Sequence, residues 1–356
     1  MGAAGFEPAA AWSEAKYSVQ AELSARIQTN LTCNNKSVGL YSISRPITYD
    51  TLSALGSNGI HVLYSVRLTT EICMTSVAVR TRACIELTRP GNAVAAGLLT
   101  FTGGFVAGGV SGAPWAVAAA VLATITATGG GNAINDYFDR EIDAINRPDR
   151  PIPRGDISAH GALWFSLGLF GVAIAAALTL PAVAVGIAVF NFLALVAYTE
   201  LFKGLPGVGN VLVGYLTGST FLFGGAAVDE PLGAAALFGL AAVATFTREI
   251  IKDVEDIDGD RQEGLRTLPI VIGQRRALAI GLAAMIAAVA ASVWPYHVGT
   301  FGVMYLAVVI PADGVMLWAT VRAFSDPSTS QRWVKRGMLL AAIAFVVGRV
   351  VVVTGI

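Results

Sequence analysis

Long apolar segments follow one another, with short polar breaks, from Ala93 to the end of the chain. An α-helix needs about 20 mostly apolar residues to cross the hydrocarbon core of a bilayer. The segments that come near this length lie at about 93–112, 115–135, 159–179, 182–200, 206–228, 231–251, 275–294, 298–321 and 335–355. The sequence therefore predicts an all-α membrane protein with about nine transmembrane helices.

Composition supports this fold class and excludes several others. Charged residues make up 13% of the chain and hydrophobic residues 54%, whereas an average soluble protein has about 25% charged residues. Lys+Arg and Asp+Glu are equal at 24 each, so no nucleic acid and no protein partner is implied. The cysteines and histidines lack the spacing of a metal or redox site: Cys33, Cys73, Cys84, His61, His160 and His297.

The first 73 residues differ in character from the rest. They contain neither an apolar run long enough to span a bilayer nor the pattern of a signal peptide. We interpret residues 1–73 as an unstructured leader or a mis-assigned upstream extension, with Met74 as the start of the protein. A disordered cytoplasmic tail is the alternative. Residues 74–356 are predicted to form the transmembrane domain.

Basic residues predict the orientation in the membrane. The odd-numbered connections between the apolar segments have no Lys or Arg, whereas the even-numbered connections and the segment before Ala93 have many. Short cytoplasmic loops carry such an excess. We therefore expect a multi-pass protein of the cell membrane, with its N-terminus and even-numbered connections in the cytoplasm.

Acidic residues cluster at the cytoplasmic ends of the second and sixth segments. If each helix continues past its apolar part, residues four apart are offset by only about 40° around its axis. Asn135, Asp139 and Asp143 then form one stripe, and Asp253, Asp256 and Asp260 form a second. Like charges at this spacing repel each other, so two such stripes indicate a cation between them.

Magnesium fits these stripes, because it binds oxygen ligands and is usually held by one or two carboxylates together with substrate phosphates. Basic residues border both stripes: Arg147, Arg150, Lys252, Arg261 and Arg266. Together they would bind a diphosphate through Mg²⁺. The alternative is a pair of solvated loops whose charges only set the topology, but ionisable groups at membrane helix ends that repeat in this way are usually functional.

The two motifs resemble the signature regions of the UbiA-type intramembrane prenyltransferases. The first runs from Asn135 and Asp136 through Asp139 and Asp143 to Arg147 and Arg150-Pro151, and the second from Asp256 and Asp260 to Thr267-Leu268-Pro269. The resemblance covers the chain from about Glu86 onward. It implies a helical bundle around a membrane-buried pocket, Mg²⁺ as cofactor and an isoprenyl diphosphate as substrate. Tyr198 and Lys203, with Asn210 beyond, resemble a third family element.

The resemblance also implies roles. Asn135, Asp139 and Asp143 would bind one metal ion, and Asp256 and Asp260 the other, with Asp253 beside them. Arg147, Lys203 and Lys252 would bind diphosphate oxygens, and Tyr198 would orient the diphosphate or face the allylic cation. An interfacial anchor is the alternative for Tyr198.

The phrases Thr88-Arg89-Pro90-Gly91-Asn92, Asn132–Asp139 and Arg248–Asp256 most resemble the family branch that adds a second geranylgeranyl chain to a glycerol phosphate ether. The acceptor is then a lipid, and its phosphate would be bound by surplus cations, with Arg150 and Arg266 preferred and Arg89 and Arg261 also available. An aromatic acceptor is the first alternative. A transporter is the second, although Asp313 and Arg349, which could pair, are the main ionisable residues inside the late segments.

Overall fold

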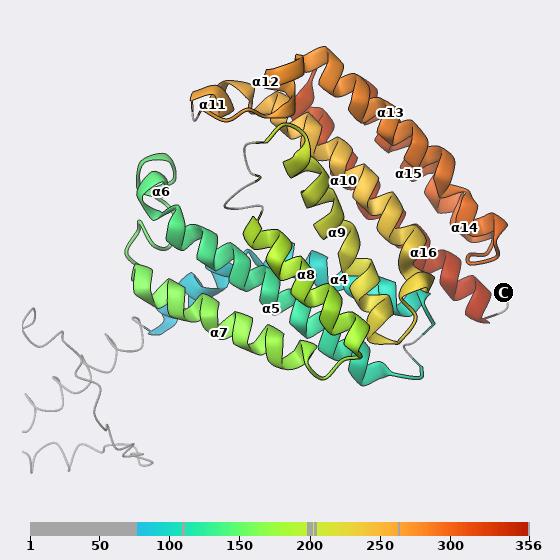
Figure 1. Ribbon diagram of the computed structural model, residues 1–356, viewed down its shortest axis with the longest axis horizontal. Helices are drawn as coiled ribbons and strands as arrows, with labels where there is room; N and C mark the ends of the chain where they lie inside the picture. The colour runs from blue at the N-terminus through green and yellow to red at the C-terminus, as the bar shows by residue number, and fades with distance from the viewer. Residues whose placement is uncertain (1–76, 109–110, 198–201, 203–204, 263, 355–356) are drawn as a thin grey trace, which may run out of the picture. The chain divides into compact units, whose positions relative to one another are not determined.

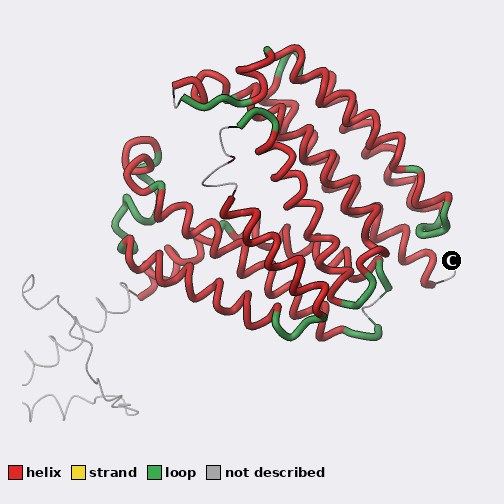
Figure 2. Tube along the Cα trace, viewed as in Figure 1, coloured by secondary structure: helices red, strands yellow, loops and turns green. Residues whose placement is uncertain are grey.

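The computed structural model describes residues 77–108, 111–197, 202, 205–262 and 264–354, which are helical and contain no strand (Figures 1 and 2). A helix at 77–88 comes first. The others are α4 (Pro90–Val106), α5 (Pro114–Phe138), α6 (Arg140–Asn146), α7 (Ala159–Ala177), α8 (Ala182–Ala197), α9 (Val208–Ala227), the 3₁₀ helix η2 (Pro231–Ala234), α10 (Ala235–Glu255), α11 (Ile257–Gln262), α12 (Leu268–Ile272), α13 (Gln274–Ser292), α14 (Trp294–His297), α15 (Val303–Arg322) and α16 (Pro327–Thr354). Residues 1–73, which we interpreted as a leader or an upstream extension, lie outside the described residues.

Each apolar segment expected to span the membrane overlaps one helix, in order α4, α5, α7, α8, α9, α10, α13, α15 and α16. In the described part of the chain, 6 helices are long and apolar enough to cross a membrane: α5, α7, η2 with α10, α13 with α14, α15 and α16. The helix α8 is apolar but shorter. The all-α membrane fold is confirmed, whereas the number of nine spans stays a prediction.

The last helix begins earlier than its apolar segment. We expected a span from about 335, but α16 begins at Pro327. Proline is favoured in the first turn of a helix, and the Asp326 carboxylate accepts a hydrogen bond from Thr329 N at 3.0 Å, which caps that turn. This bond and Arg322 lower the pKa of Asp326. The first turns of α16 are therefore a polar extension of the apolar span.

Glycines bring α9 close to the helices on both of its sides. A Cβ atom on Gly224 of α9 would lie 1.9 Å from the Thr100 carbonyl oxygen of α4, and one on Gly103 would lie 2.1 Å from the Phe221 carbonyl oxygen. Small residues let membrane helices approach this closely. The helix α9 is thus packed directly against the backbone of α4.

Two glycines four residues apart bring α9 equally close to α10. Gly214 and Gly218 face α10, where added Cβ atoms would lie 2.6 Å from Ala242 O and 2.5 Å from Phe238 O. Gly108 has the same four-residue spacing from Gly104, but it follows the end of α4 with a φ of 92°. Gly108 therefore lies in a turn whose backbone adopts the left-handed region, and not in a contact between helices.

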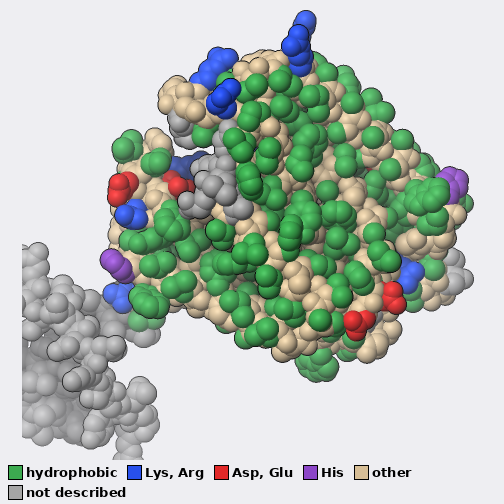
Figure 3. Space-filling view, viewed as in Figure 1, with side chains coloured by type: hydrophobic (Ala, Val, Ile, Leu, Met, Phe, Trp, Pro, Cys, Tyr) green, Lys and Arg blue, Asp and Glu red, His purple; other side chains and the backbone are tan. Residues whose placement is uncertain are grey.

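Apolar side chains remain exposed over the helical bundle, as a lipid-facing surface requires. Trp115 is 86% exposed, Leu232 84% and Trp164 71%. On the face shown in Figure 3, hydrophobic side chains cover most of the middle, and charged side chains lie towards the ends. This distribution matches a bundle surrounded by hydrocarbon, with its charges near the two interfaces.

The suggested pairing of Asp313 with Arg349 is wrong. The Asp313 carboxylate on α15 accepts a hydrogen bond from the Ser292 hydroxyl at 2.7 Å. Tyr305 donates its hydroxyl to the Ser292 carbonyl oxygen, also at 2.7 Å. These bonds tie the end of α13 to α15. They also give the buried Asp313 carboxylate and the buried Tyr305 hydroxyl the hydrogen-bond partners that such groups need. The Arg349 guanidinium lies beside Gly108 instead.

Candidate active site

The first acidic stripe forms as the sequence predicts. The helix α5 ends at Phe138 and α6 begins at Arg140. Backbone hydrogen bonds nevertheless continue through the junction, from Asp139 N to Asn135 O, from Asp143 N to Asp139 O and from Arg147 N to Asp143 O, each 2.8 Å long. The four side chains therefore follow one another at intervals of one turn. Asn135 and Arg147 are exposed, Asp139 is half-buried and Asp143 is buried.

A network of ion pairs lies beside this stripe. Arg150 Nη1 hydrogen-bonds Asp136 Oδ1 at 2.9 Å and also Asp143 Oδ2. Arg89 Nη2 hydrogen-bonds the same Asp136 oxygen at 2.6 Å. Arg150, predicted to bind substrate, thus already contacts two carboxylates, and Asp143, predicted to bind metal, already contacts a cation. Their roles towards substrate and metal stay predictions.

Asp136 is a member of this network for which the sequence predicted no role. It lies seven residues before Asp143, so the two carboxylates share a helix face to within about 20°. Both are 5% exposed. A pair of buried carboxylates two turns apart requires cations nearby, and the arginines that follow α6 could have been assigned to them on that ground.

The loop that carries Arg150 is fixed to the start of the domain. Arg154 Nη2 pairs with Glu86 Oε2 at 2.7 Å, and its Nε donates to Asp156 Oδ2 at 2.8 Å. Hydrogen bonds from Arg154 and Arg82 lower the pKa of Glu86. The helix at 77–88 and the loop after α6 therefore support the first motif from one side.

The second acidic stripe also continues past its helix. The helix α10 ends at Glu255, and α11 follows from Ile257 to Gln262. Asp256 N donates to Lys252 O, and Asp260 N donates to Asp256 O, each at 2.9 Å. Partial desolvation by the surrounding protein raises the pKa of Asp256, although its side chain is exposed, and the neighbouring carboxylates of Glu255 and Asp260 add to the shift. A group in such surroundings gains from a bound cation.

Two predicted residues of the second motif have partners on α9 and α10. Asn210 Nδ2, on α9, donates to Asp253 Oδ2 at 2.7 Å. Lys252 Nζ pairs with Glu249 Oε2 at 2.9 Å. Glu249 also contacts Arg248, whose Nη2 in turn reaches Gln331 on α16 at 3.2 Å. Asn210 and Asp253 thus link the third predicted element to the second motif.

The remaining basic residues of the prediction lie near α11. Arg261 at the end of α11 and Arg266 in the segment after it are both exposed. Exposed cations at this position can reach an anionic ligand. Tyr198 and Lys203 lie outside the described residues.

The two motifs lie at the same end of the helical bundle, where α6 follows α5 and α11 follows α10 (Figure 1). Among the described residues, no three His, Cys, Asp or Glu side chains come close enough to hold a metal ion by themselves. Mg²⁺ commonly takes one or two carboxylates and completes its shell with waters and substrate phosphates. The oxygen donors of the two stripes fit that mode of binding rather than a closed protein cage.

An apolar cavity of about 560 Å³ runs from the first motif into the bundle. It is lined by α5, α7, α8 and α9, with Asn132 and Asn135 among its lining residues. Asn132 Nδ2 also donates to Thr88 O at 2.9 Å. A long hydrocarbon chain could therefore lie in the cavity while its polar end meets Asn135.

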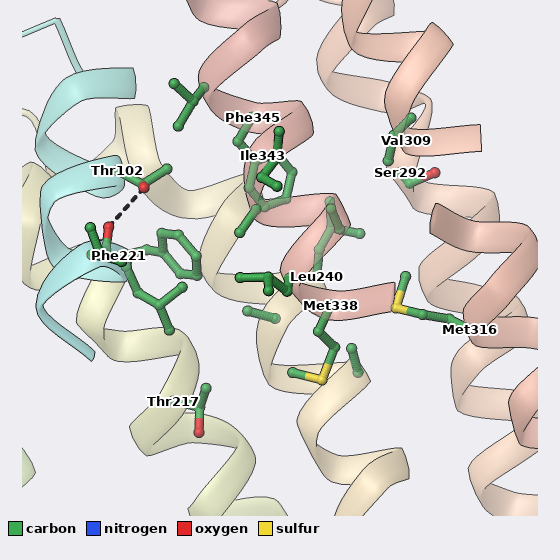
Figure 4. A pocket seen from close by; sticks show the side chains of 18 of the residues that line it. Thr102, Thr217, Phe221, Leu240, Ser292, Val309, Met316, Met338, Ile343 and Phe345 are labelled. Carbon is green, nitrogen blue, oxygen red and sulfur yellow. Dashed lines mark hydrogen bonds between the residues drawn. The ribbon is translucent and has the colours of Figure 1, made fainter. Parts of the chain in front are cut away.

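A second apolar cavity, of about 440 Å³, lies between α4, α9, α10, α13, α15 and α16. Figure 4 shows Phe221, Leu240, Met338 and Phe345 around it, and the Thr102 hydroxyl is turned back to the Leu98 carbonyl at 2.8 Å. Lys335 also lines it. Both cavities are lined mainly by apolar side chains, as a site for lipid chains requires.

These features define a multi-pass helical membrane protein that can bind an anionic head group at one end and hydrocarbon inside. The family model of the UbiA prenyltransferase family matches residues 96–345. The chain belongs to this family.

Two relatives are similar over nearly their whole length. The digeranylgeranylglyceryl phosphate synthase of Natronomonas pharaonis is 62% identical over 77% of this chain and 99% of its own. That of Haloquadratum walsbyi is 60% identical over 77% of this chain and 97% of its own. A match of this length in a chain of 356 residues must include both acidic motifs.

Solved structures share the fold. A structure described as giving insights into digeranylgeranylglyceryl phosphate synthase in membranes has a TM-score of 0.67 and 32% identity, and covers 76% of this chain and 99% of its own. A UbiA homologue from Archaeoglobus fulgidus, bound to GPP and Mg²⁺, has a TM-score of 0.57 and 17% identity over 76% of this chain and 99% of its own. The latter likeness concerns the fold alone.

Proposed function

We propose that this protein transfers a geranylgeranyl group from geranylgeranyl diphosphate to the free hydroxyl of geranylgeranylglyceryl phosphate, as a digeranylgeranylglyceryl phosphate synthase does. The observation that carries the proposal is 62% identity to such a synthase over 99% of its length. The two acidic stripes beside an apolar cavity support the same conclusion from the chain's own residues.

In this reaction the bond between the allylic carbon and the diphosphate oxygen breaks, and its electron pair leaves with the diphosphate. The hydroxyl oxygen of the acceptor then bonds to the allylic carbon, and its proton passes to the departing diphosphate. Mg²⁺, when bound, neutralises charge on the leaving group. The apolar cavity excludes water, so that the cation meets the acceptor instead of being hydrolysed.

The residues of the two motifs would each bind one metal ion. Asn135, Asp139 and Asp143 are proposed to bind one metal ion, and Asp256 and Asp260 the other, with Asp253 beside them. The supporting observation is that each stripe keeps its one-turn spacing past the end of its helix.

The basic residues would bind the anions. Arg147, Lys203 and Lys252 are proposed to bind the diphosphate, and Tyr198 to orient it. Arg261 and Arg266 remain exposed for the phosphate of the acceptor. We now favour Arg266 over Arg150 for that phosphate, because the Nη1 atom of Arg150 is shared by Asp136 and Asp143.

The orientation proposed from the basic residues places both motifs on the cytoplasmic face of the cell membrane. The observation that supports it is that α6 and α11 share one end of the bundle (Figure 1).

The test is incubation of the purified protein with geranylgeranyl diphosphate, Mg²⁺ and a panel of acceptors. The panel contains geranylgeranylglyceryl phosphate, its dephosphorylated form, 4-hydroxybenzoate, a dihydroxynaphthoate and homogentisate. We expect product from the phosphorylated ether, and little from the dephosphorylated one, which lacks a charge-assisted contact of about 1.5–3 kcal/mol. Prenylation of an aromatic acceptor with none of the ether lipid would reject the proposed acceptor and keep the reaction class.

A further inference from the structure

Asp136 is the buried acidic residue of the first motif that the proposed metal site does not use. It is 5% exposed, whereas its neighbour Asn135 is exposed. A carboxylate buried this deeply stays ionised only when cations and hydrogen bonds compensate it. The cations that contact Asp136 therefore indicate its role.

Those partners form a neutral group of four side chains. Arg89 and Arg150 both bind the same oxygen of Asp136, at 2.6 Å and 2.9 Å. Arg150 uses the same nitrogen, Nη1, for Asp143. Two guanidinium groups thus balance two carboxylates, and one nitrogen atom joins the proposed metal ligand Asp143 to Asp136.

The backbone provides an independent observation. Arg89 has a φ of 47° and a ψ of 68°, a left-handed conformation that residues other than glycine adopt at a cost. Thr88, the residue before it, accepts the hydrogen bond from Asn132 on α5. Residues 88 and 89 are therefore tied to two positions one turn apart on α5. Such a strained conformation persists where surrounding contacts impose it. Here those contacts are the hydrogen bonds to Asn132 and Asp136, which lie at the first motif.

We propose that Asp136 and Arg89 are positioning residues that divide Arg150 between two carboxylates and so set how strongly Asp143 is held away from a metal ion. The proposal rests on the metal and diphosphate site of the proposed function. In this arrangement Asp136 competes with Asp143 for Arg150, and Arg89 moderates the competition by sharing Asp136.

The arrangement predicts that substitutions of Asp136 and of Arg89 change the affinity for a metal ion in opposite directions. Asp136→Asn removes the competing charge, so Arg150 pairs fully with Asp143 and metal binding weakens. Arg89→Gln leaves Asp136 with one cation, so Arg150 moves towards Asp136 and Asp143 becomes more available. A role in folding alone would weaken metal binding in both variants.

The experiment measures binding of Mn²⁺ in the presence of inorganic diphosphate, by electron paramagnetic resonance on the full chain in detergent. For Asp136→Asn we expect the Mn²⁺ Kd to rise by about 10- to 100-fold, as for other residues that orient metal ligands. For Arg89→Gln we expect an equal or lower Kd with a lower kcat, and recovery of kcat in Arg89→Lys. Asp149→Asn, an exposed acid in the same loop, is the matched control and should bind Mn²⁺ as the wild type does.

Each other outcome has a definite meaning. Equal Mn²⁺ affinity in Asp136→Asn and Asp149→Asn would overturn the inference and leave the proposed reaction intact. A wild type that binds Mn²⁺ with the expected variant effects but transfers no prenyl group would reject the proposed function alone. If Asp136→Asn does not fold, weaker Mn²⁺ binding in a folded Arg89→Gln contradicts the inference, and a wild type that binds no Mn²⁺ overturns both proposals.

Discussion

Asp256 and Asp258 are two residues apart and have different surroundings. Asp256 N closes a backbone bond to Lys252 O, and Asp260 N closes one to Asp256 O, so Asp256 belongs to the stripe. Asp258 lies about 200° around the helix axis from Asp256. Both side chains are exposed. The direction of a carboxylate, rather than its exposure, therefore decides whether it belongs to the proposed metal site.

The variant Asp256→Ala is expected to lose transfer activity, because it removes a proposed ligand of the metal ion that would neutralise the leaving diphosphate. Such losses amount to several kcal/mol of barrier, and each 1.4 kcal/mol lowers the rate about tenfold. Asp258→Ala is the matched control and should keep most of the activity. Single-turnover rates at saturating Mg²⁺ make the comparison, and equal rates in the two variants would exclude the second stripe as a metal site.

The contact between Asn210 and Asp253 predicts a loss of stability at the same site. Asn210→Ala removes the donor to Asp253 Oδ2 and leaves a half-buried carboxylate without it. An unsatisfied polar group of this kind costs about 1–3 kcal/mol. Thermal unfolding in detergent without Mg²⁺ measures the effect, with the exposed Asn146→Ala as control. Unfolding temperatures that do not differ would show that water replaces the amide.

At the scale of elements, α9 is packed closely against two neighbouring helices. Its glycines meet backbone atoms of α4 on one side and of α10 on the other. It also lines both cavities, through Leu216 and Thr220 in one and Thr217 and Phe221 in the other. A displacement of α9 would therefore change both cavities together.

The variant Gly224→Ala should destabilise the bundle, because a Cβ atom would lie 1.9 Å from the Thr100 carbonyl oxygen and force α4 and α9 apart. Overpacking of this kind costs about 1–3 kcal/mol. Gly171→Ala on α7 is the control: a Cβ atom there meets nothing within 4 Å. It should be neutral or stabilising by up to about 1 kcal/mol. Unfolding curves in detergent compare the two, and similar destabilisation of both would contradict the close α4–α9 contact.

At the scale of the whole molecule, the distribution of charge and the helix connections agree. Most of the basic residues after Met74 lie in or next to the connections that follow α5, α8, α10 and α15. One acidic motif extends from α5 into the connection that follows it, and the other extends from α10 into its own following connection. A single diphosphate can be bound by both only if they face the same side of the membrane.

Accessibility of single cysteines tests this orientation. In a chain whose Cys33, Cys73 and Cys84 are replaced by serine, Asp149→Cys and Asp258→Cys should react with an impermeant thiol reagent only from the cytoplasmic side. Asp229→Cys should react only from the outside. Intact cells and inverted vesicles give the two sides. Labelling of positions 149 and 258 from opposite sides would be incompatible with a shared site.

The sequence by itself determined the elements and the two stripes. Long apolar segments allow only helices in lipid, and one-turn spacing follows from helix geometry wherever the helix continues, as it does past Phe138 and Glu255. These features depend on residues close together along the chain. For that reason they could be predicted without knowledge of tertiary contacts.

The tertiary structure alone decided which polar residues from distant parts of the chain are paired. Arg89 and Asp136 are 47 positions apart, and Asn210 and Asp253 are 43 apart. No local pattern connects such residues, because their distance depends on how the helices pack. The same reason explains the wrong pairing of Asp313 with Arg349: the packing of α13 against α15 brings Ser292 to that carboxylate instead.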